Sequence, residues 1–145
     1  MMEMPETLLD AVREHGREAY PEECCGALLG VNHGQDVRVK RIERLVNSRV
    51  GDRSRRYTID PKEYARVEAL ASQAGLSLLG FYHSHPDHPP VPSDYDREHA
   101  LPFFHYLVVA VAAGVPGRPA AWILSEDRGV FQRETLVSRE PGRTP

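Results

Sequence analysis

The chain has 145 residues, of which 41% are hydrophobic and 27% are charged, as in ordinary globular domains. This length can bury one core, so we expect a single domain over residues 1–137 and a disordered tail over 138–145. A formal net charge of -3 gives no reason to expect nucleic acid as a partner. We see neither a signal peptide nor about 18 consecutive apolar residues, and therefore expect a cytoplasmic protein that does not span a membrane.

The N-terminal third alternates between helical and extended patterns. Apolar residues recur at helical spacing from about 5 to 20, and Pro21 ends this helix. The apolar run at 24–31 predicts a strand buried on both faces. A turn signal at 32–34 then leads into an alternating strand at 36–46, which completes a hairpin.

The middle of the chain carries a basic loop at 47–56, followed by a short expected strand at 57–59. Asp60 caps a helix that begins with Pro61 and runs to about residue 73. A mostly apolar strand at 76–83 comes next. The remaining expected elements are a short helix at 93–100 and strands at 105–112, 119–125 and 129–134. This order favours an α+β sheet flanked by helices.

Two histidines stand at the exit of the strand at 76–83. Side chains at positions i and i+2 point to the same face of a strand, so His83 and His85 can reach one ion. Asp96 offers an oxygen ligand, returned by a loop that four prolines stiffen. Three protein ligands leave one tetrahedral position for water, which is typical of a catalytic site with one Zn²⁺ ion.

The segment Ser93-Asp94-Tyr95-Asp96 has a second interpretation. Ser93 can be the N-cap of a helix with Asp96 in its first turn, and this capping role does not exclude metal binding. Asp94 is the rival ligand by position. The Ser93 hydroxyl could also donate to the oxyanion that develops when a carbonyl is attacked.

A metal-bound water needs a proton acceptor, and none lies within the histidine motif. Glu22 and Glu23 stand at the junction of the first helix and first apolar strand, where either carboxylate could move a proton. Local sequence does not choose between them.

The segments Glu23-Cys24-Cys25-Gly26 and His83-Ser84-His85-Pro86…Ser93-Asp94-Tyr95-Asp96 resemble the JAMM/MPN+ family of zinc metallo-isopeptidases. The resemblance covers nearly the whole domain. It implies His83, His85 and Asp96 as ligands of one zinc ion, Ser93 as oxyanion support and Glu23 as general acid/base.

The same resemblance implies a cytidine-deaminase-like fold, known in this family as the JAB/MPN domain. The short chain is similar to the compact prokaryotic branch, whose members hydrolyse amide bonds after the C-terminal Gly-Gly of ubiquitin-like or sulfur-carrier proteins. We expect such a carrier as the partner, and neither nucleic acid nor membrane. The basic loop Arg49–Arg56 is a candidate for gripping the carrier, although a solvated loop is the more ordinary explanation of its charges.

Two other classes of protein are less compatible with these residues. A non-catalytic binding module of the same family would have lost a ligand or the glutamate, whereas all five positions are present here. A thiol enzyme would use Cys24 or Cys25, but an apolar run beside two glutamates disfavours a reactive thiolate. The leaving group and the oligomeric state are left open by the sequence.

Overall fold

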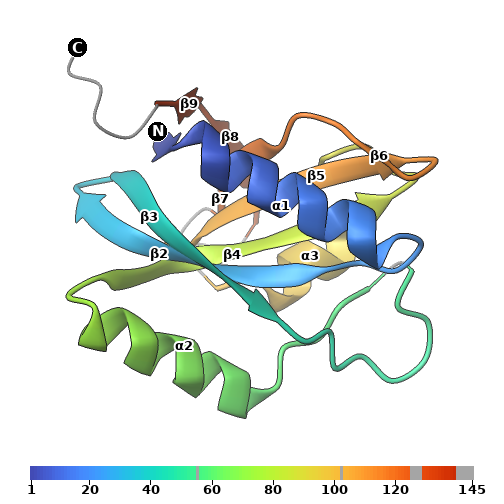
Figure 1. Cartoon of the computed structure of the whole chain (residues 1–145), viewed down its shortest axis with the longest axis horizontal. Coiled ribbons are helices and arrows are strands. Elements are labelled where there is room, and N and C mark those ends of the chain that lie inside the picture. The colour runs from blue at the N-terminus through green and yellow to red at the C-terminus, as the bar shows by residue number, and fades with distance from the viewer. Residues whose placement is uncertain (55, 102, 125–128, 140–145) are drawn as a thin grey trace.

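The computed structural model describes residues 1–54, 56–101, 103–124 and 129–139. In this part of the chain, the helices lie around one long curved sheet (Figure 1). The helices are α1 (Glu6–Ala19), α2 (Pro61–Gln73) and α3 (Asp94–His99). The strands are β1 (Met2–Met4), β2 (Cys25–His33), β3 (Asp36–Leu45), β4 (Ser77–Pro86), β5 (His105–Ala112), β6 (Val115–Pro116), β7 (Ala120–Leu124), β8 (Phe131–Glu134) and β9 (Leu136–Ser138). The expected α+β architecture is confirmed.

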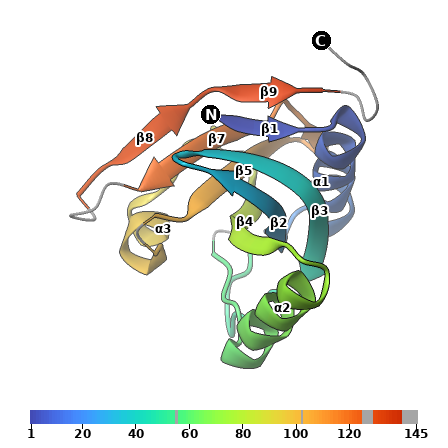
Figure 2. The same cartoon turned by 90° about the vertical axis from the view of Figure 1, so that its left-hand side faces the viewer.

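The sheet has the strand order β8-β7-β5-β4-β2-β3-β1-β9, with β6 paired to β5. Strands β4 and β5 are parallel, whereas β2 is antiparallel to both of its neighbours. Strands β8 and β9 stand at opposite ends of this order, yet only Thr135 separates them in the chain. The Thr135 carbonyl accepts the Met2 N–H at 2.8 Å. The sheet therefore curls strongly, and β8 and β9 follow one another along its rim (Figure 2).

The two faces of the sheet bury two separate apolar clusters. Helix α1 contributes Leu9 and Val12 to one cluster, where they pack with residues of β1, β3, β4 and β5. Helix α2 contributes Val67 and Ala71 to the other cluster, with inward side chains of β2, β4 and β5. Strand β2 is buried over its first six residues because it lies between these two layers. This central position fixes β2 and β4, which carry the candidate site.

Helix α2 begins where the sequence predicts. The Asp60 side chain accepts the Lys62 N–H at 2.8 Å, and Pro61 occupies the first helical position, where no N–H is needed. This cap fixes the residue at which α2 begins.

Several elements differ from the expectation. Residues 57–59 are not a strand, because the Thr58 N–H bonds the Asn47 side chain (3.1 Å) instead of a strand backbone. Strands β1, β6 and β9 were not expected; they have only two or three residues and exist through pairing with longer strands.

Strand β9 ends at Ser138, one residue past the expected domain boundary at 137. The rest of the expected tail from 140 onward, and residue 125 of the expected strand at 119–125, lie outside the described residues. The domain limits therefore stay a prediction. Within the described part of the chain, none of the helices combines the length and apolar character needed to cross a membrane.

Candidate metal centre and catalytic cleft

Strand β4 presents both histidines of the motif on the α2 side of the sheet. Alternation places Phe81, His83 and His85 on this face, while Tyr82 and Ser84 point to the α1 side. The exposed fractions of the two histidines are only 1% and 6%. A buried strand thus delivers two adjacent imidazoles as expected.

Helix α3 brings Asp96 to these imidazoles. The Ser93 side chain accepts the Asp96 N–H at 3.1 Å, and Asp96 Oδ2 accepts the Ser93 N–H at 2.8 Å. This reciprocal capping box is the helix-cap interpretation of the sequence, and it is confirmed. The same Oδ2 also faces both histidines, so capping and ligand geometry coexist. Asp94, the rival ligand, is exposed instead.

Three ligand-type atoms converge at one point. His83 Nε2, His85 Nε2 and Asp96 Oδ2 lie 3.1 Å from one another. Ligands about 2.0–2.1 Å from a tetrahedral ion would be separated by about 3.3 Å, so the triangle has the right size for zinc. Two imidazoles and one carboxylate are also a donor set that suits this ion.

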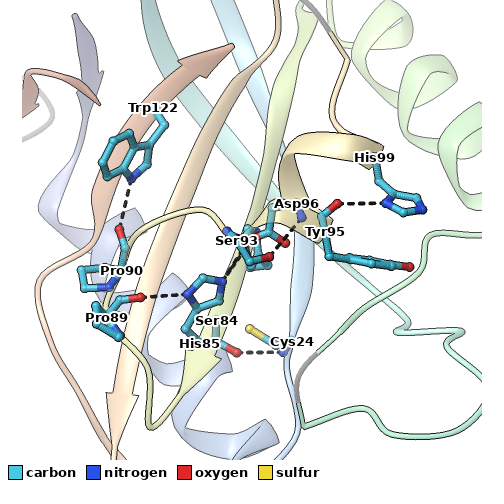
Figure 3. A network of polar contacts seen from close by, with 11 residues as sticks. Cys24, Ser84, His85, Pro89, Pro90, Ser93, Tyr95, Asp96, His99 and Trp122 are labelled. Carbon is cyan, nitrogen blue, oxygen red and sulfur yellow. Dashed lines mark hydrogen bonds and ion pairs between the residues drawn. The ribbon is translucent and has the colours of Figure 1, made fainter. Parts of the chain in front are cut away.

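The second nitrogen of His85 is held by the proline loop (Figure 3). His85 Nδ1 lies 2.8 Å from the Pro89 carbonyl oxygen, to which it donates, and this turns Nε2 toward His83 and Asp96. The Trp122 indole N–H donates to the next carbonyl, that of Pro90, at 3.1 Å. These bonds explain how a loop without secondary structure fixes a ligand ring.

Glu23 lies beside the same histidines. Its carboxylate offers an oxygen within a group of atoms, with His83 and His85, that all lie within 4.8 Å of one another. By position it is thus an alternative third ligand, but Asp96 is closer to both rings. Glu23 is 3% exposed, and its Oε1 has no hydrogen-bond partner among the described residues. Glu22 is exposed, so the structure separates the two glutamates that the sequence left open.

The pKa values of the two buried carboxyl groups, Glu23 and Asp96, are shifted in opposite directions. Burial, and then the negative charges of Asp96 and Asp52, raises the pKa of Glu23 to about 9. For Asp96, burial acts in the same direction, but the charge of His83, the hydrogen bonds of both histidines and that of the Ser93 N–H outweigh it and hold the pKa of Asp96 well below its usual value. Asp96 is therefore the ionised carboxylate and Glu23 is the proton-holding one.

An open cleft of about 520 Å³ leads to these groups. Its lining includes Glu23, Arg56, His85, His88, Pro89, Val91, Ser93, Asp94 and Tyr95. Ser93 is exposed in this cleft, and its O–H remains available because the hydroxyl oxygen only accepts within the capping box. His88 is exposed and its ring stands 6.5 Å from that of His85, as a cleft residue rather than a ligand.

The backbone of Glu23 is fixed on both sides of the residue. The Glu23 N–H donates to the Arg53 carbonyl at 2.6 Å, and the Asn47 side-chain amide donates to the Glu23 carbonyl at 3.1 Å. The next residue, Cys24, donates its N–H to the Ser84 hydroxyl at 2.8 Å. Ser84 lies between the two histidines in sequence, so the glutamate and the ligands share one hydrogen-bonded frame.

Cys24 and Cys25 are free and buried. Burial raises the pKa of the Cys24 thiol to about 11 and that of the Cys25 thiol to about 12. Both groups are therefore neutral near pH 7, which disfavours the thiol-enzyme hypothesis.

Sequence reasoning missed two residues that contact this centre, Asn47 and Tyr57. The Tyr57 ring stacks on the His83 ring, with the ring centroids 4.8 Å apart and the planes 28° from parallel. Tyr57 also lines an aromatic cavity of about 260 Å³ together with Asp96. An aromatic residue at the end of a polar loop was the signal available, but its partner lies 26 positions away in sequence.

Residues 5–124 match the family model described as prokaryotic homologs of the JAB domain. This match spans most of the chain. The chain therefore belongs to the prokaryotic JAB family, which is the resemblance drawn from its motifs.

Curated relatives agree with this assignment. A protein of Haloferax volcanii named desampylase is 36% identical over 104 residues, which cover 68% of this chain and 73% of that protein. The desampylase of Pyrococcus furiosus is 30% identical, with 79% of this chain and 76% of that protein covered. A Thermus thermophilus protein named "Probable TtuB-protein conjugate cleaving protease" is 32% identical, with coverage of 67% and 62%.

Solved structures match nearly the whole chain. A Salinibacter ruber protein is 42% identical, with a TM-score of 0.75 and coverage of 99% of this chain and 95% of that one. A JAB1/MPN domain protein from Archaeoglobus fulgidus is 17% identical, with a TM-score of 0.59 and coverage of 97% and 98%. The second match supports the expected JAB/MPN fold alone.

Proposed function

We propose that this protein is a zinc-dependent isopeptidase that hydrolyses the amide bond after the C-terminal Gly-Gly of a ubiquitin-like or sulfur-carrier protein. The observation that carries the proposal is the convergence of His83, His85 and Asp96 beside the buried carboxyl of Glu23. Relatives named desampylase and TtuB-protein conjugate cleaving protease support the substrate class.

His83, His85 and Asp96 would hold the ion, since their ligand atoms are the closest set. A bound Zn²⁺ would polarise the scissile carbonyl and lower the pKa of a water molecule to about 7. Glu23 accepts the proton of that water and later donates it to the leaving amine. Burial suits the second step, because a carboxyl with a raised pKa retains a proton until the amine takes it. For the first step the carboxyl must be ionised, and the positive charge of a bound ion would favour that form.

Ser93 supports the charge that develops on the carbonyl oxygen. Its hydroxyl lines the cleft, and the capping box holds the oxygen in place while the hydrogen is free to turn toward the substrate. A donor fixed in this way needs little rearrangement during the reaction.

The cleft also suits an extended glycine tail, and Arg56 at its rim could contact the carrier. Glycines lack a Cβ and can pass close to buried groups. The Arg56 guanidinium lies over the Tyr95 ring, 4.5 Å from its centroid, and both residues line the cleft. This placement supports the proposal that the loop Arg49–Arg56 grips the carrier, with Arg55 lying outside the described residues.

The test is cleavage of a conjugate in which the Gly-Gly end of a sulfur carrier is joined to a lysine side chain. The zinc-loaded protein should release the carrier with an intact Gly-Gly end, detected by intact mass spectrometry, and a chelator should stop the reaction. A matched conjugate ending in Ala-Ala should be cleaved at least about tenfold more slowly. Binding of the carrier without release would instead support the non-catalytic binding module.

The contribution of the rim is tested with Arg56→Glu. This variant should cleave the carrier conjugate more slowly, while Arg118→Glu, which changes an exposed arginine outside the cleft, should not. Equal rates for Arg56→Glu and the unchanged protein would remove the loop from the proposal.

A further inference from the structure

The two candidate ligand histidines are supported in different ways. A metal-ligating histidine ordinarily donates its second ring N–H to an oxygen, which fixes the orientation of the ring. His85 follows this pattern through the Pro89 carbonyl at 2.8 Å. His83 Nδ1 is buried and has no hydrogen-bond partner among the described residues. On the Nδ1 side of His83, the described residues therefore offer a contact other than a hydrogen bond.

The Tyr57 ring occupies the position from which it can orient His83. It stacks on His83 at 4.8 Å between centroids, with the planes within 28° of each other. Offset stacking of this kind restricts rotation of the imidazole, because any turn about χ2 would drive its edge into the tyrosine ring. Tyr57 is itself half-buried, on the same side of the sheet as α2.

Tyr57 is held through both of its neighbours in the chain. The Asn47 amide donates to the Arg56 carbonyl at 3.1 Å and accepts the Thr58 N–H at 3.1 Å. The Ser48 N–H adds a bond to the Thr58 carbonyl at 2.9 Å. One amide side chain thus fixes the backbone before and after Tyr57, in a segment without regular secondary structure.

We infer that Tyr57 is the positioning residue for His83, and that its ring replaces the hydrogen bond that His83 Nδ1 lacks. Asn47 completes the device by fixing Tyr57, while the same amide also holds the Glu23 carbonyl. The inference rests on the proposed zinc site. The aromatic ring of Tyr57 orients His83 in this inference, and the tyrosine hydroxyl has no part in it.

The test is the zinc dissociation constant, measured by competition with a chromophoric chelator and without substrate. Tyr57→Leu should bind zinc about 10- to 100-fold more weakly, the range typical of residues that orient a ligand. Tyr57→Phe should bind within about twofold of the unchanged protein, because the ring remains. Tyr64→Leu is the matched control, since Tyr64 lines the same aromatic cavity but contacts Phe81 rather than His83.

A merely structural role would lower the unfolding midpoint of metal-free Tyr57→Leu and Tyr64→Leu alike and leave both zinc affinities unchanged. Unchanged affinity in folded Tyr57→Leu would overturn the inference while leaving the proposed function intact. Failure of the unchanged protein to bind zinc would overturn both. If Tyr57→Leu does not fold, the test uses Asn47→Ala, which keeps the Tyr57 ring but releases the backbone on either side of it. Weaker zinc binding by this variant supports the inference, and unchanged binding overturns it.

Discussion

At the scale of single residues, the centre depends on two carboxyl groups with different surroundings. Asp96 sits among hydrogen-bond donors, whereas Glu23 Oε1 is buried without a partner among the described residues. Leaving a buried polar oxygen unpaired costs free energy unless a ligand or water satisfies it. This arrangement is typical of a functional carboxyl group rather than a structural one.

The role of Glu23 is tested with Glu23→Gln. The amide has the shape of the carboxyl group but cannot take a proton, so we expect hydrolysis to fall by about 100-fold or more. Zinc content, measured in parallel by mass spectrometry, should be unchanged. The control is Glu22→Gln, which alters the exposed neighbouring side chain and should keep full activity. Full activity in Glu23→Gln would move the proton acceptor elsewhere.

The thiols are tested by replacing both cysteines with alanine. Because burial raises the pKa of Cys24 to about 11 and of Cys25 to about 12, neither supplies a thiolate near pH 7. The double variant should lose some stability, as small buried groups are removed, but keep most of its rate of hydrolysis. Complete loss of hydrolysis in a folded double variant would revive the thiol mechanism.

At the scale of elements, the close packing of β2 on β4 explains the glycine three positions after Glu23. A Cβ at Gly26 would lie 2.0 Å from Cε2 of Tyr82, whose fully buried ring has no room to move. The Tyr82 ring can therefore lie over β2 only because position 26 lacks a side chain. The same pairing sets Cys25 opposite His83, which brings the adjacent Glu23 beside the histidines.

The requirement for this glycine is tested with Gly26→Ala. Overpacking against a buried aromatic ring should lower the free energy of unfolding by about 3 kcal/mol, measured by urea denaturation. Gly117→Ala is the control, because a Cβ there would meet its nearest atom at an ordinary 3.8 Å. Similar stability of the two variants would contradict the packing account.

Elements with a strong pattern were predictable, and those defined by their neighbours were not. Helix α2 was marked by its cap, and β2 by its apolar run, because both signals are local. Strand β1 has only three residues and forms through parallel pairing with β3 and β9, which no local pattern records. The spacing of His83, His85 and Asp96 predicted their convergence, whereas the stacking of Tyr57 depends on how distant segments meet.

At the scale of the whole molecule, we expect the packing of α1 on the sheet to depend on pH. His15 of α1 lies with its Nδ1 2.7 Å from the Tyr82 hydroxyl, which donates to the neutral ring. Burial, and then the positive charge of Arg44, lowers the pKa of His15 to about 4. In the unfolded chain this pKa returns to about 6.5, so the unfolded state binds more protons between these values.

The contribution of neutral His15 to the free energy of unfolding should therefore be fully present above pH 6.5. It should decrease as the pH falls toward 4. Because His15 is half-buried and solvent screens its charge, we expect its share of the loss to be about 1–2 kcal/mol. His15→Gln keeps an acceptor for Tyr82 but does not titrate, so the metal-free variant should lose that much less stability between pH 7.5 and pH 4. Identical losses in urea denaturation would contradict this assignment.

The metal centre is the feature on which fold, motif and proposed chemistry all depend. Zinc stoichiometry by native mass spectrometry tests it most directly, on the unchanged protein, on Asp96→Ala and on Asp94→Ala. We predict one tightly held zinc ion in the unchanged protein and in Asp94→Ala, and weakened binding in Asp96→Ala, because Asp96 Oδ2 faces both histidines. A folded, unchanged protein that takes up no zinc would contradict the account, and would leave Ser93 and Asp96 with only their helix-capping role.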